Sequence, residues 1–468
     1  MRRSCVVFWI FALSMPLAGI SSLAAQAPNG GAAQASTPPA SSSATSANPL
    51  VTLLKSPDAG VRARAARDLG KGHDASVIPA LAEALSDPSE KVRREVVLSL
   101  AQIHEAAALD ALIKATQDAD DDCRALAVES LVGYYTGTVP TPGFSGFVKK
   151  NWDRAKSHFS SDFTRIDPGI KVEPKVIVAL DTELKDRRSR YTAREAAKGL
   201  GILTAQSAVP DLVKAAHSSD EDLSLEALNA LSKIKDLTAG PPLVDLLDSP
   251  NKEIKQEAAV TVGILRTQQA LPKLQSMFEN ATDEKTKEKG LEGLAYLADP
   301  ASNPVFLKAL WSYDKAMRTS AAEGLARTAD PKNVPELQKA VMTEKDGDTK
   351  LALRYAITAA GKTDYLNDVV DELSSKSHGD AAQSYLVELA RTPAFLPKLY
   401  PYLQSSNATV RRRLCTVLMY TGDQTSLEQL DRLEHDSNGD VVSESLRAKR
   451  AIRARLDAAA ATPKTEGH

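Results

Sequence analysis

The sequence predicts an all-α solenoid, which is a row of stacked helical hairpins, and three observations support this prediction. A pattern of apolar residues recurs about every 31 residues over most of the chain. Within each copy the apolar residues have helical spacing and are interrupted once by a turn. Aromatic residues make up 5% of the sequence and hydrophobic residues 43%, so the core must consist mainly of small aliphatic side chains. A fixed period that contains two helices is typical of a helical repeat array.

The clearest copy lies between residues 77 and 100. Residues 77–85 carry apolar side chains at helical spacing, and Asp87-Pro88 ends this first helix because proline disfavours helix at the preceding residue. A second amphipathic helix follows, and its apolar stripe consists of Val92, Val96, Val97 and Leu100.

Leu100 gives the register of the other copies. Leu69 and Leu131 lie 31 residues before and after it, and the pattern resumes at Leu200 after an interruption. The further equivalents, with looser spacing from Ala360 onward, are Leu231, Val262, Leu294, Leu325, Ala360, Leu389, Leu418 and Lys449. We count twelve copies, which places repeats 1–3 at residues 49–135 and repeats 4–12 at residues 174–457, followed by a disordered tail at 458–468.

The copies share the motif Asp-Pro-x-x-x-Val-Arg-x-x-Ala-Ala-x-x-Leu-Gly, which residues 57–70 show most fully and residues 194–201 and 318–325 show in part. This motif resembles HEAT repeats, specifically the short HEAT-like kind first noticed in phycobilin lyases. The resemblance implies a right-handed α-solenoid with the second helices on the concave side, and the period gives it about 12 hairpins and one inserted segment. Because most HEAT-like proteins are scaffolds and only a minority act on substrates, it implies little about the particular function.

The N-terminal residues have the three parts of a secretory signal peptide. Met1-Arg2-Arg3 is positive, residues 5–20 are apolar, and Ser22-Leu23-Ala24 offers small residues for cleavage after Ala24. An uncleaved membrane anchor is the alternative, although the apolar run is short for a span. Residues 25–48, rich in Ala, Ser and Pro and without charge, are expected to be a flexible linker. We therefore expect an exported bacterial protein of the periplasm or the extracellular space.

No group of residues predicts catalysis. The histidines form neither His-x-x-x-His nor His-Glu-x-x-His, and no glycine-rich phosphate loop is present. Cys123 and Cys415 fall at positions that are apolar in other copies, which predicts buried and unreactive thiols. A net charge of −2 provides no basic domain for nucleic acid. We predict no catalytic, cofactor-binding or metal-binding residue, no cofactor, no nucleic-acid partner and no small-molecule substrate.

One segment interrupts the period. Leu131 and Leu200 are 69 residues apart, so about residues 136–173 form an insertion, within which we expect an amphipathic helix with aromatic and basic sides. Insertions in repeat arrays often project from the binding face. Its candidate partner-binding residues are Phe144, Phe147, Trp152, Phe159, Phe163, Lys149, Lys150 and Arg154.

Three interpretations of the insertion are open. Its aromatic side chains could fold back onto the solenoid as a cap, contact a protein partner or contact a membrane surface. For the whole protein the sequence favours a non-enzymatic scaffold or adaptor that binds a protein or peptide on the concave face, with the insertion as an accessory contact. The alternatives are a peripheral membrane-associated protein that docks through the insertion, and a lyase-like protein or accessory subunit of an enzyme.

Overall fold

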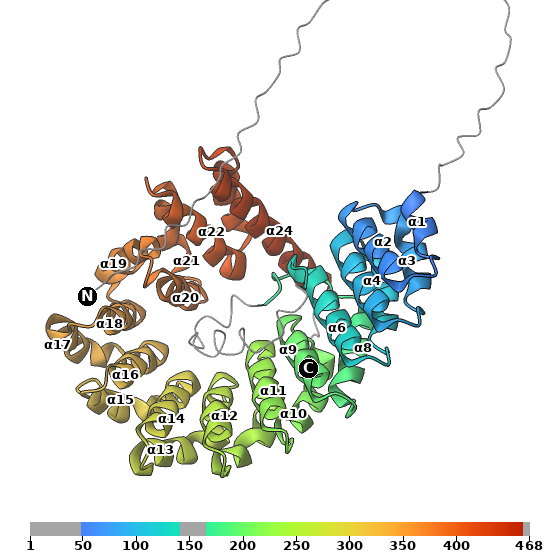
Figure 1. The fold of residues 1–468 in the computed structure, drawn as a ribbon. Coiled ribbons are helices and arrows are strands. Elements are labelled where there is room, and N and C mark those ends of the chain that lie inside the picture. The colour runs from blue at the N-terminus through green and yellow to red at the C-terminus, as the bar shows by residue number, and fades with distance from the viewer. Residues whose placement is uncertain (1–47, 141–164, 462–468) are drawn as a thin grey trace, which may run out of the picture. The chain divides into compact units, whose positions relative to one another are not determined.

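The computed structural model describes residues 48–140 and 165–461, which belong to one unit of the chain. In these two ranges the regular elements are α-helices and short 3-10 helices, and no β-strand is present. They pair into twelve helical hairpins that follow one another along the chain (Figure 1). The predicted all-α solenoid of twelve hairpins is therefore confirmed.

Each hairpin has a shorter first helix and a longer second helix. The first helices, of which η6 is a 3-10 helix, are α1 (Pro49–Leu53), α3 (Ile78–Ala84), α5 (Leu109–Ala115), α8 (Pro174–Lys185), α10 (Val209–Ala216), η6 (Pro241–Asp248), α13 (Leu271–Asn280), α15 (Asn303–Ala309), α17 (Val334–Thr343), α19 (Leu366–Asp371), α21 (Leu396–Leu399) and α23 (Gln424–Asp431). The second helices are α2 (Ala59–Lys71), α4 (Glu90–Ile103), α6 (Asp121–Thr136), α9 (Arg190–Ile202), α11 (Glu221–Ile234), α12 (Lys252–Ile264), α14 (Glu284–Leu297), α16 (Lys315–Thr328), α18 (Gly347–Ala359), α20 (Gly379–Ala390), α22 (Ala408–Thr421) and α24 (Gly439–Ala461). The last helix extends into the segment that was expected to be a disordered tail.

Most second helices begin at a side-chain cap. The Asp58 carboxylate accepts a hydrogen bond from the backbone N–H of Val61 at 3.0 Å, and Asp120 does the same for Cys123 at 3.0 Å. Such a cap satisfies one of the N–H groups that the first helical turn leaves without a partner. The turn in each copy therefore ends one helix and starts the next.

The caps also correct the register of the ninth hairpin. The register residue lies eleven positions after the residue that precedes each second helix, as Leu325 lies after Asp314. Eleven positions after Asp346 stands Ile357, which is fully buried, whereas Ala360 is the residue that follows α18. The prediction of Ala360 as the register residue was wrong for two reasons. Ile357 and Ala360 are three residues apart and so lie on one side of the helix, and Ala360-Gly361 resembles the Leu-Gly that ends other copies.

A guanidinium clamp joins the turns of neighbouring hairpins. The Arg62 side chain donates from Nε and Nη2 to both carboxylate oxygens of Asp87 at 2.6 and 2.8 Å, and from Nη1 to the carbonyl of Ser56 at 2.9 Å. The same clamp recurs in Arg93 with Asp118, Arg318 with Glu344 and Arg411 with Asp436. The arginine of the sequence motif thus ties the turn of its own copy to the turn of the next copy.

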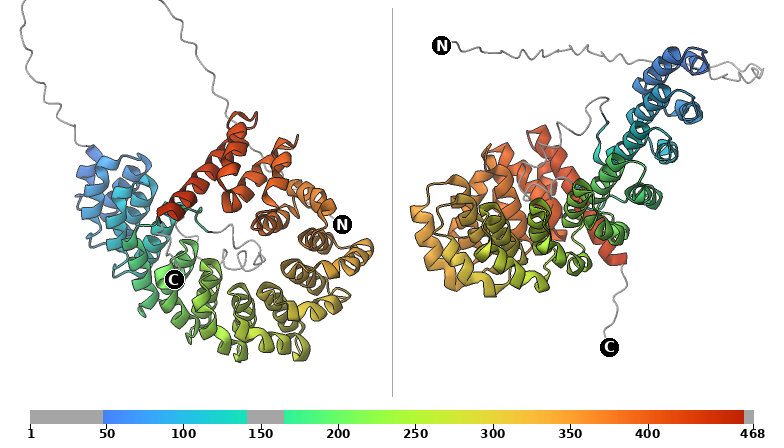
Figure 2. Two further views of the ribbon diagram at one scale, coloured as in Figure 1. Left: turned by 180° about the vertical axis from the view of Figure 1, so that it is seen from behind. Right: turned by 60° about the horizontal axis from the view of Figure 1, so that its bottom comes forward.

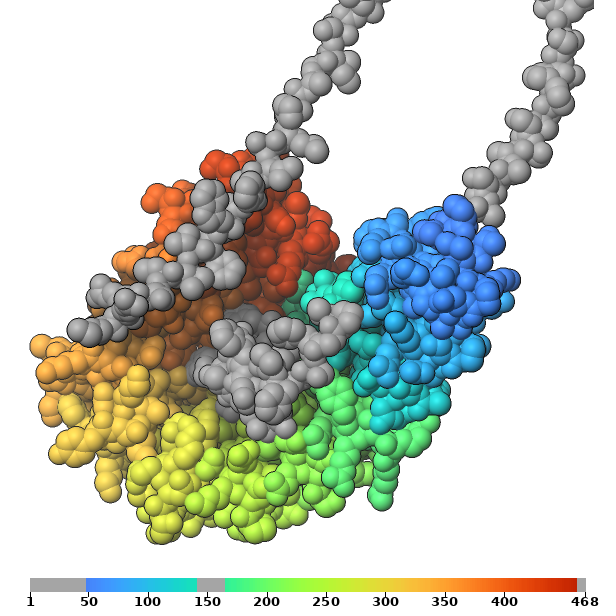
Figure 3. All heavy atoms as spheres, viewed as in Figure 1, coloured from blue at the N-terminus to red at the C-terminus, as the bar shows by residue number. Residues whose placement is uncertain are grey.

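Neighbouring second helices pack closely at small residues. A Cβ atom added to Gly201 would lie 2.7 Å from the Cα of Ala230, and one added to Gly263 would lie 2.3 Å from the carbonyl oxygen of Gly293. Because the spacing of packed helices depends on the side chains at the contact, small residues bring the second helices together. Figure 1 shows second helices such as α14, α16 and α18 on the inner side of the row and α13, α15 and α17 on the outer side. Figures 2 and 3 show the hairpins stacked in contact along the row.

The C-terminal part of the insertion, from Arg165 onward, joins distant parts of the array. Arg165 donates to the carbonyl of Lys233 at 2.8 Å, and the N–H of Ile166 donates to the carbonyl of Ile202 at 3.0 Å. Asp167 then forms a bidentate ion pair with Arg447 of α24, 280 residues further along the chain. This contact ties the last hairpin to the fourth and fifth, and nothing in the repeat pattern predicts it.

Both cysteines of the described residues lie in the core. Cys123 and Cys415 are fully buried and unpaired, and burial raises the pKa of each thiol to about 12. The prediction that they are buried core residues is confirmed. Among residues 48–140 and 165–461, no helix is long and apolar enough to cross a membrane.

Candidate binding surface on the second helices

The predicted partner-binding residues of the insertion lie outside the described residues. These are Phe144, Phe147, Trp152, Phe159, Phe163, Lys149, Lys150 and Arg154. The structure does describe both ends of the inserted segment. On the N-terminal side the N–H of Thr138 donates to the carbonyl of Gly133 at 3.0 Å, and on the C-terminal side the N–H of Glu173 donates to the hydroxyl of Tyr135 at 3.0 Å. The insertion therefore leaves from the end of α6 and returns beside the ends of α6, α9 and α11.

The second helices of hairpins seven to ten share a buried polar network. Its centre is Arg327 of α16, whose side chain is 3% exposed. Arg327 donates from Nε and Nη2 to the two carboxylate oxygens of Glu388 in α20, at 3.0 and 3.1 Å. Its Nη1 lies 3.6 Å from Oε2 of Glu323, and its guanidinium lies 4.2 Å from the ring centre of Tyr296 in α14. One arginine thus connects three second helices.

Two stacked tyrosines complete this network. The rings of Tyr355 in α18 and Tyr385 in α20 are parallel within 9°, with their centres 4.4 Å apart. The Tyr355 hydroxyl donates to Glu388 at 2.6 Å, and the Tyr385 hydroxyl donates to Glu323 at 2.8 Å. Each carboxylate therefore accepts a tyrosine hydrogen bond in addition to its contact with Arg327, as buried charged groups require.

The two carboxylates of the network differ in protonation. Burial raises the pKa of Glu323 to about 7, although Arg327 and the Tyr385 hydroxyl oppose this shift. Burial also favours the neutral form of Glu388, but its direct bidentate pair with Arg327 and the Tyr355 hydrogen bond lower the pKa of Glu388 below the ordinary value. Glu388 is therefore the permanent counter-ion of Arg327, and Glu323 is the group that titrates near neutral pH.

The network spans more than one neighbouring contact. Glu323 and Arg327 lie on α16, whereas Tyr385 and Glu388 lie on α20, two hairpins away. These contacts hold α16 and α20 at a fixed separation across α18, so they fix the curvature of this part of the row. This network was not predicted from the sequence. The available signal was the pair Glu323 and Arg327, spaced four residues apart on one helix face.

Ion pairs also link the N-terminal ends of the second helices. The Arg94 guanidinium donates to both carboxylate oxygens of Asp120 at 2.8 Å, and this hydrogen bond holds the pKa of Asp120 at about 2. Arg194 contacts Asp220 in the same way at 2.7 and 2.8 Å. These aspartates also cap their helices, so this end of the second-helix surface is charged and held in place.

The described residues offer little for metal chemistry. No group of three or more His, Cys, Asp or Glu side chains in residues 48–140 and 165–461 has an arrangement that could hold a metal ion. The buried thiols, with a pKa of about 12, are not nucleophiles at neutral pH. What the second-helix row presents is a regular, charged and preformed surface.

The twelve stacked hairpins and the surface formed by their second helices together define a helical repeat scaffold. The family model of HEAT repeats matches residues 47–132, 178–263 and 271–358, which is more than half of the chain. The chain therefore belongs to the HEAT-repeat family, and the predicted resemblance is confirmed. A sequence comparison with curated proteins gives no match.

Two solved structures match this chain at low identity. An engineered protein is 19% identical, with a TM-score of 0.38, over 86% of this chain and 98% of its own. The complex of CpcE and CpcF of phycocyanin lyase from Nostoc sp. PCC7120 is also 19% identical, with a TM-score of 0.35, over 60% of this chain and 94% of its own. Both TM-scores are below 0.5, so family membership rests on the family model.

Proposed function

We propose that the protein is a non-enzymatic scaffold or adaptor that binds a protein or peptide along the second-helix surface. The observation that carries this proposal is the continuous row of second helices, packed at small residues and presenting side chains at a regular spacing. A repeat array of this kind offers an extended binding surface without a catalytic centre.

The buried network supports the same function. A surface that already has its bound shape loses less conformational entropy when a partner binds. The contacts of Arg327 with Glu388 and of Tyr385 with Glu323 hold α16 and α20 in one arrangement. The surface between hairpins seven and ten is therefore preorganised for a partner.

The insertion serves in this proposal as an accessory contact. The ends of the inserted segment attach beside α6, α9 and α11, so the segment starts and ends at the second-helix surface. Aromatic and arginine side chains are enriched at protein interfaces, which favours this role for Phe147 and Trp152.

The decisive experiment is affinity capture followed by matched variants. The mature chain, immobilised, is used to capture partners from the envelope extract of its own host, and the captured protein is purified. Lys198→Glu with Lys233→Glu on α9 and α11 should weaken its binding at least tenfold. Lys214→Glu with Lys308→Glu on the first helices α10 and α15 should change binding less than twofold. Equal losses in both pairs would overturn the proposal, and a captured enzyme would favour the accessory-subunit alternative.

A second experiment tests the insertion. Phe147→Ala with Trp152→Ala should remove the accessory contact and reduce partner binding while helical content and melting temperature stay unchanged. A much lower melting temperature would instead show that the aromatic side chains form a structural cap. Binding of the wild-type chain to anionic liposomes, lost in this double variant, would favour the peripheral membrane alternative.

We also propose that the protein is exported and that its signal is cleaved after Ala24. The positive start, the apolar run and the small residues before this site support the proposal. Cell fractionation and N-terminal sequencing test it. A chain that starts at Ala25 in the periplasm or medium is expected, whereas an intact Met1 in the membrane fraction would show an anchor.

A further inference from the structure

A groove lies at the turns of hairpins eight and nine, beside the N-terminal end of α16. It is lined by residues 310–313 in the turn before α16, by Arg318 of α16, and by Ala340 and residues 343–345 at the end of α17, and its volume is about 300 Å³. This is at the small end of the range for ligand pockets and is large enough for one bulky side chain. We call it the turn groove.

The turn groove carries two aromatic residues that the other copies lack. Trp311 and Tyr313 stand three positions and one position before Asp314, the cap of α16. The equivalent pairs are Lys55 and Pro57, Ser86 and Pro88, Gln117 and Ala119, Asp186 and Arg188, His217 and Ser219, Asp248 and Pro250, Asn280 and Thr282, Thr343 and Lys345, Ser375 and Ser377, Gln404 and Ser406, and His435 and Ser437. None of these contains Phe, Tyr or Trp, so the fold does not require an aromatic side chain there.

Both aromatic side chains face solvent. Tyr313 is fully exposed and Trp311 is 45% exposed, although large aromatic residues usually bury most of their surface. Trp311 is nevertheless held in place, because its Nε1 donates to Glu336 at 3.0 Å and the Lys339 ammonium lies 4.9 Å from its ring centre. An ordered, exposed aromatic side chain beside a groove is typical of an interface anchor.

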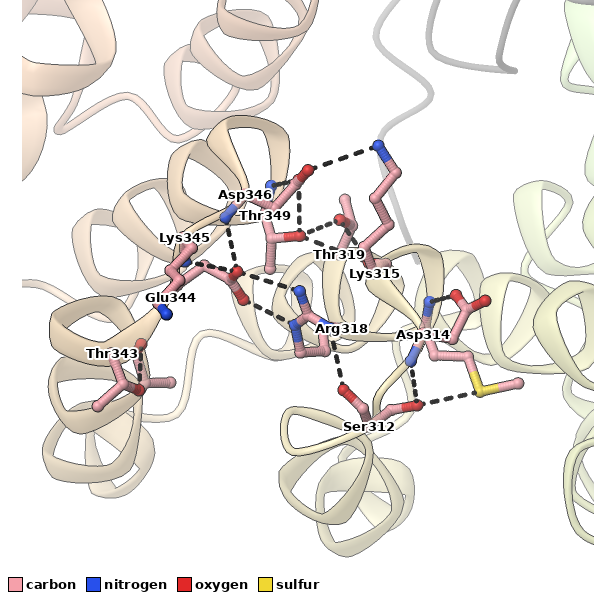
Figure 4. Close-up of polar contacts among 12 residues, drawn as sticks. Ser312, Asp314, Lys315, Arg318, Thr319, Thr343, Glu344, Lys345, Asp346 and Thr349 are labelled. Atoms are coloured by element: carbon pink, nitrogen blue, oxygen red, sulfur yellow. Dashed lines mark hydrogen bonds and ion pairs between the residues drawn. The ribbon is translucent and has the colours of Figure 1, made fainter.

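Beneath the aromatic residues, the clamp of the repeat keeps the groove rigid. Arg318 donates to both carboxylate oxygens of Glu344 at 2.7 and 3.1 Å and to the carbonyl of Ser312 at 3.0 Å (Figure 4). It also donates to the carbonyl of Tyr313 at 3.0 Å. This pairing neutralises Glu344 and fixes the backbone that carries Tyr313. The groove therefore keeps its shape without a ligand.

The charges around the turn groove select the occupant. Of the carboxylates near the groove, Glu344 pairs with Arg318, Glu336 with Lys339 at 3.5 Å and Asp346 with Lys315 at 3.4 Å. Asp314 caps α16 and does not line the groove. The ammonium of Lys345, which lines the groove, has no ion-pair partner among the described residues. Among the side chains that line the groove the excess charge is therefore positive, and it complements a carboxylate on the occupant.

We propose that the turn groove docks an extended peptide segment of a protein partner, in which a bulky apolar side chain stands next to an acidic one. The apolar side chain enters the groove against Trp311 and Tyr313, and the carboxylate pairs with Lys345. This site lies at the turns, beside the N-terminal end of α16, and gives the scaffold a second point of attachment.

The test uses a displayed library of random peptides, selected on the full mature chain. Trp311→Thr with Tyr313→Lys gives the turn the residues of the next copy, Thr343 and Lys345, and is used for counter-selection. We expect enriched peptides to combine an aromatic or long aliphatic residue with an adjacent Asp or Glu. Their synthetic forms, measured by fluorescence anisotropy, should bind the double variant at least tenfold more weakly than the wild-type chain.

Two further variants make the result decisive. Lys345→Glu keeps both aromatic residues and should weaken these peptides at least tenfold, whereas Gln404→Thr with Ser406→Lys, at the equivalent turn before α22, should have no effect. All variants should have the melting temperature of the wild-type chain, since the substituted side chains are on the surface. Failure to enrich peptides over the double variant, or enrichment without an acidic residue, would overturn the proposal. Self-association that only the double variant abolishes would assign the groove to a second copy instead.

Discussion

Hairpins seven to ten share the turn clamp with the first three hairpins, through Arg318 and Glu344, but they also contain a second kind of contact. In the first group, Arg62 and Arg93 clamp each turn to the next one, and the contact repeats with the period of the sequence. In the second group, Arg327 and its carboxylates connect second helices that are two copies apart. The clamp fixes how neighbours stack, and the network fixes how a longer part of the row curves. A repeat protein can therefore add local rigidity without disturbing its period.

The largest expected effect is on the network. Replacing Arg327 with Met leaves Glu388 buried without its cation, which should lower the free energy of unfolding by about 3–5 kcal/mol. Denaturant titration followed by circular dichroism measures this loss. Small-angle X-ray scattering should also show a changed radius of gyration, because α16 and α20 lose the bidentate pair of Arg327 with Glu388 and keep only the hydrogen bond of Tyr385 to Glu323 from this network. A loss below about 1 kcal/mol with unchanged scattering would mean that the network does not hold the curvature.

The next effect depends on pH. Burial raises the pKa of Glu323 from the ordinary 4.5 to about 7, so the stability that Glu323 contributes is complete below pH 4.5 and is lost as the pH rises to about 7. The amide introduced by Glu323→Gln does not titrate, so this variant should gain about 3 kcal/mol relative to the wild-type chain over this range. Parallel titrations of Glu284→Gln, whose side chain is 72% exposed, provide the control. A pH-independent difference between Glu323→Gln and the wild-type chain would contradict the raised pKa.

Removing the clamp should lower the free energy of unfolding by less than removing the network does. The Arg93 side chain is 14% exposed and makes charge-assisted hydrogen bonds to Asp118, so Arg93→Ala should cost about 1–2 kcal/mol. The loss should appear in denaturant titration without a change in the radius of gyration, since the second-helix packing stays. A cost as large as that of Arg327→Met would remove the distinction between the two regions.

The same distinction explains what the sequence could predict. Leu69, Leu100 and Leu131 repeat because every copy must cover the apolar side of the next, so the fold and the twelve hairpins follow from one period. The motif arginine was visible, but its carboxylate belongs to the next copy, 25 residues later in the case of Arg62 and Asp87. The contact therefore appears only after the hairpins are stacked.

The candidate sites were harder to predict. The pair of Tyr385 with Glu323 joins residues 62 positions apart, and no local pattern encodes such a separation. The ion pair of Asp167 with Arg447 depends on the curvature of the whole row of hairpins. Trp311 and Tyr313 could have been found, because aligning the copies shows that only this turn is aromatic. The predicted partner-binding residues of the insertion stay a prediction.

The smallest expected effect is a change in thiol labelling, which distinguishes a local opening from a global one. Cys123 and Cys415 are fully buried, so neither should react with a maleimide in the native wild-type chain at neutral pH, and both should react after unfolding. Cys123 lies beside the clamp, since Asp120 caps its backbone N–H and Arg93 binds Asp118 two residues before Asp120. Arg93→Ala should therefore speed the labelling of Cys123 several-fold and leave Cys415 unchanged, as mass spectrometry of the labelled peptides would show. Equal acceleration at both thiols would mean that the clamp stabilises the whole array, and rapid labelling of the wild-type chain would contradict the burial of these residues. Arg327→Met is the matched comparison, because it loosens hairpins seven to ten and leaves the clamp of Arg93 intact. It should therefore not speed the labelling of Cys123 by local opening.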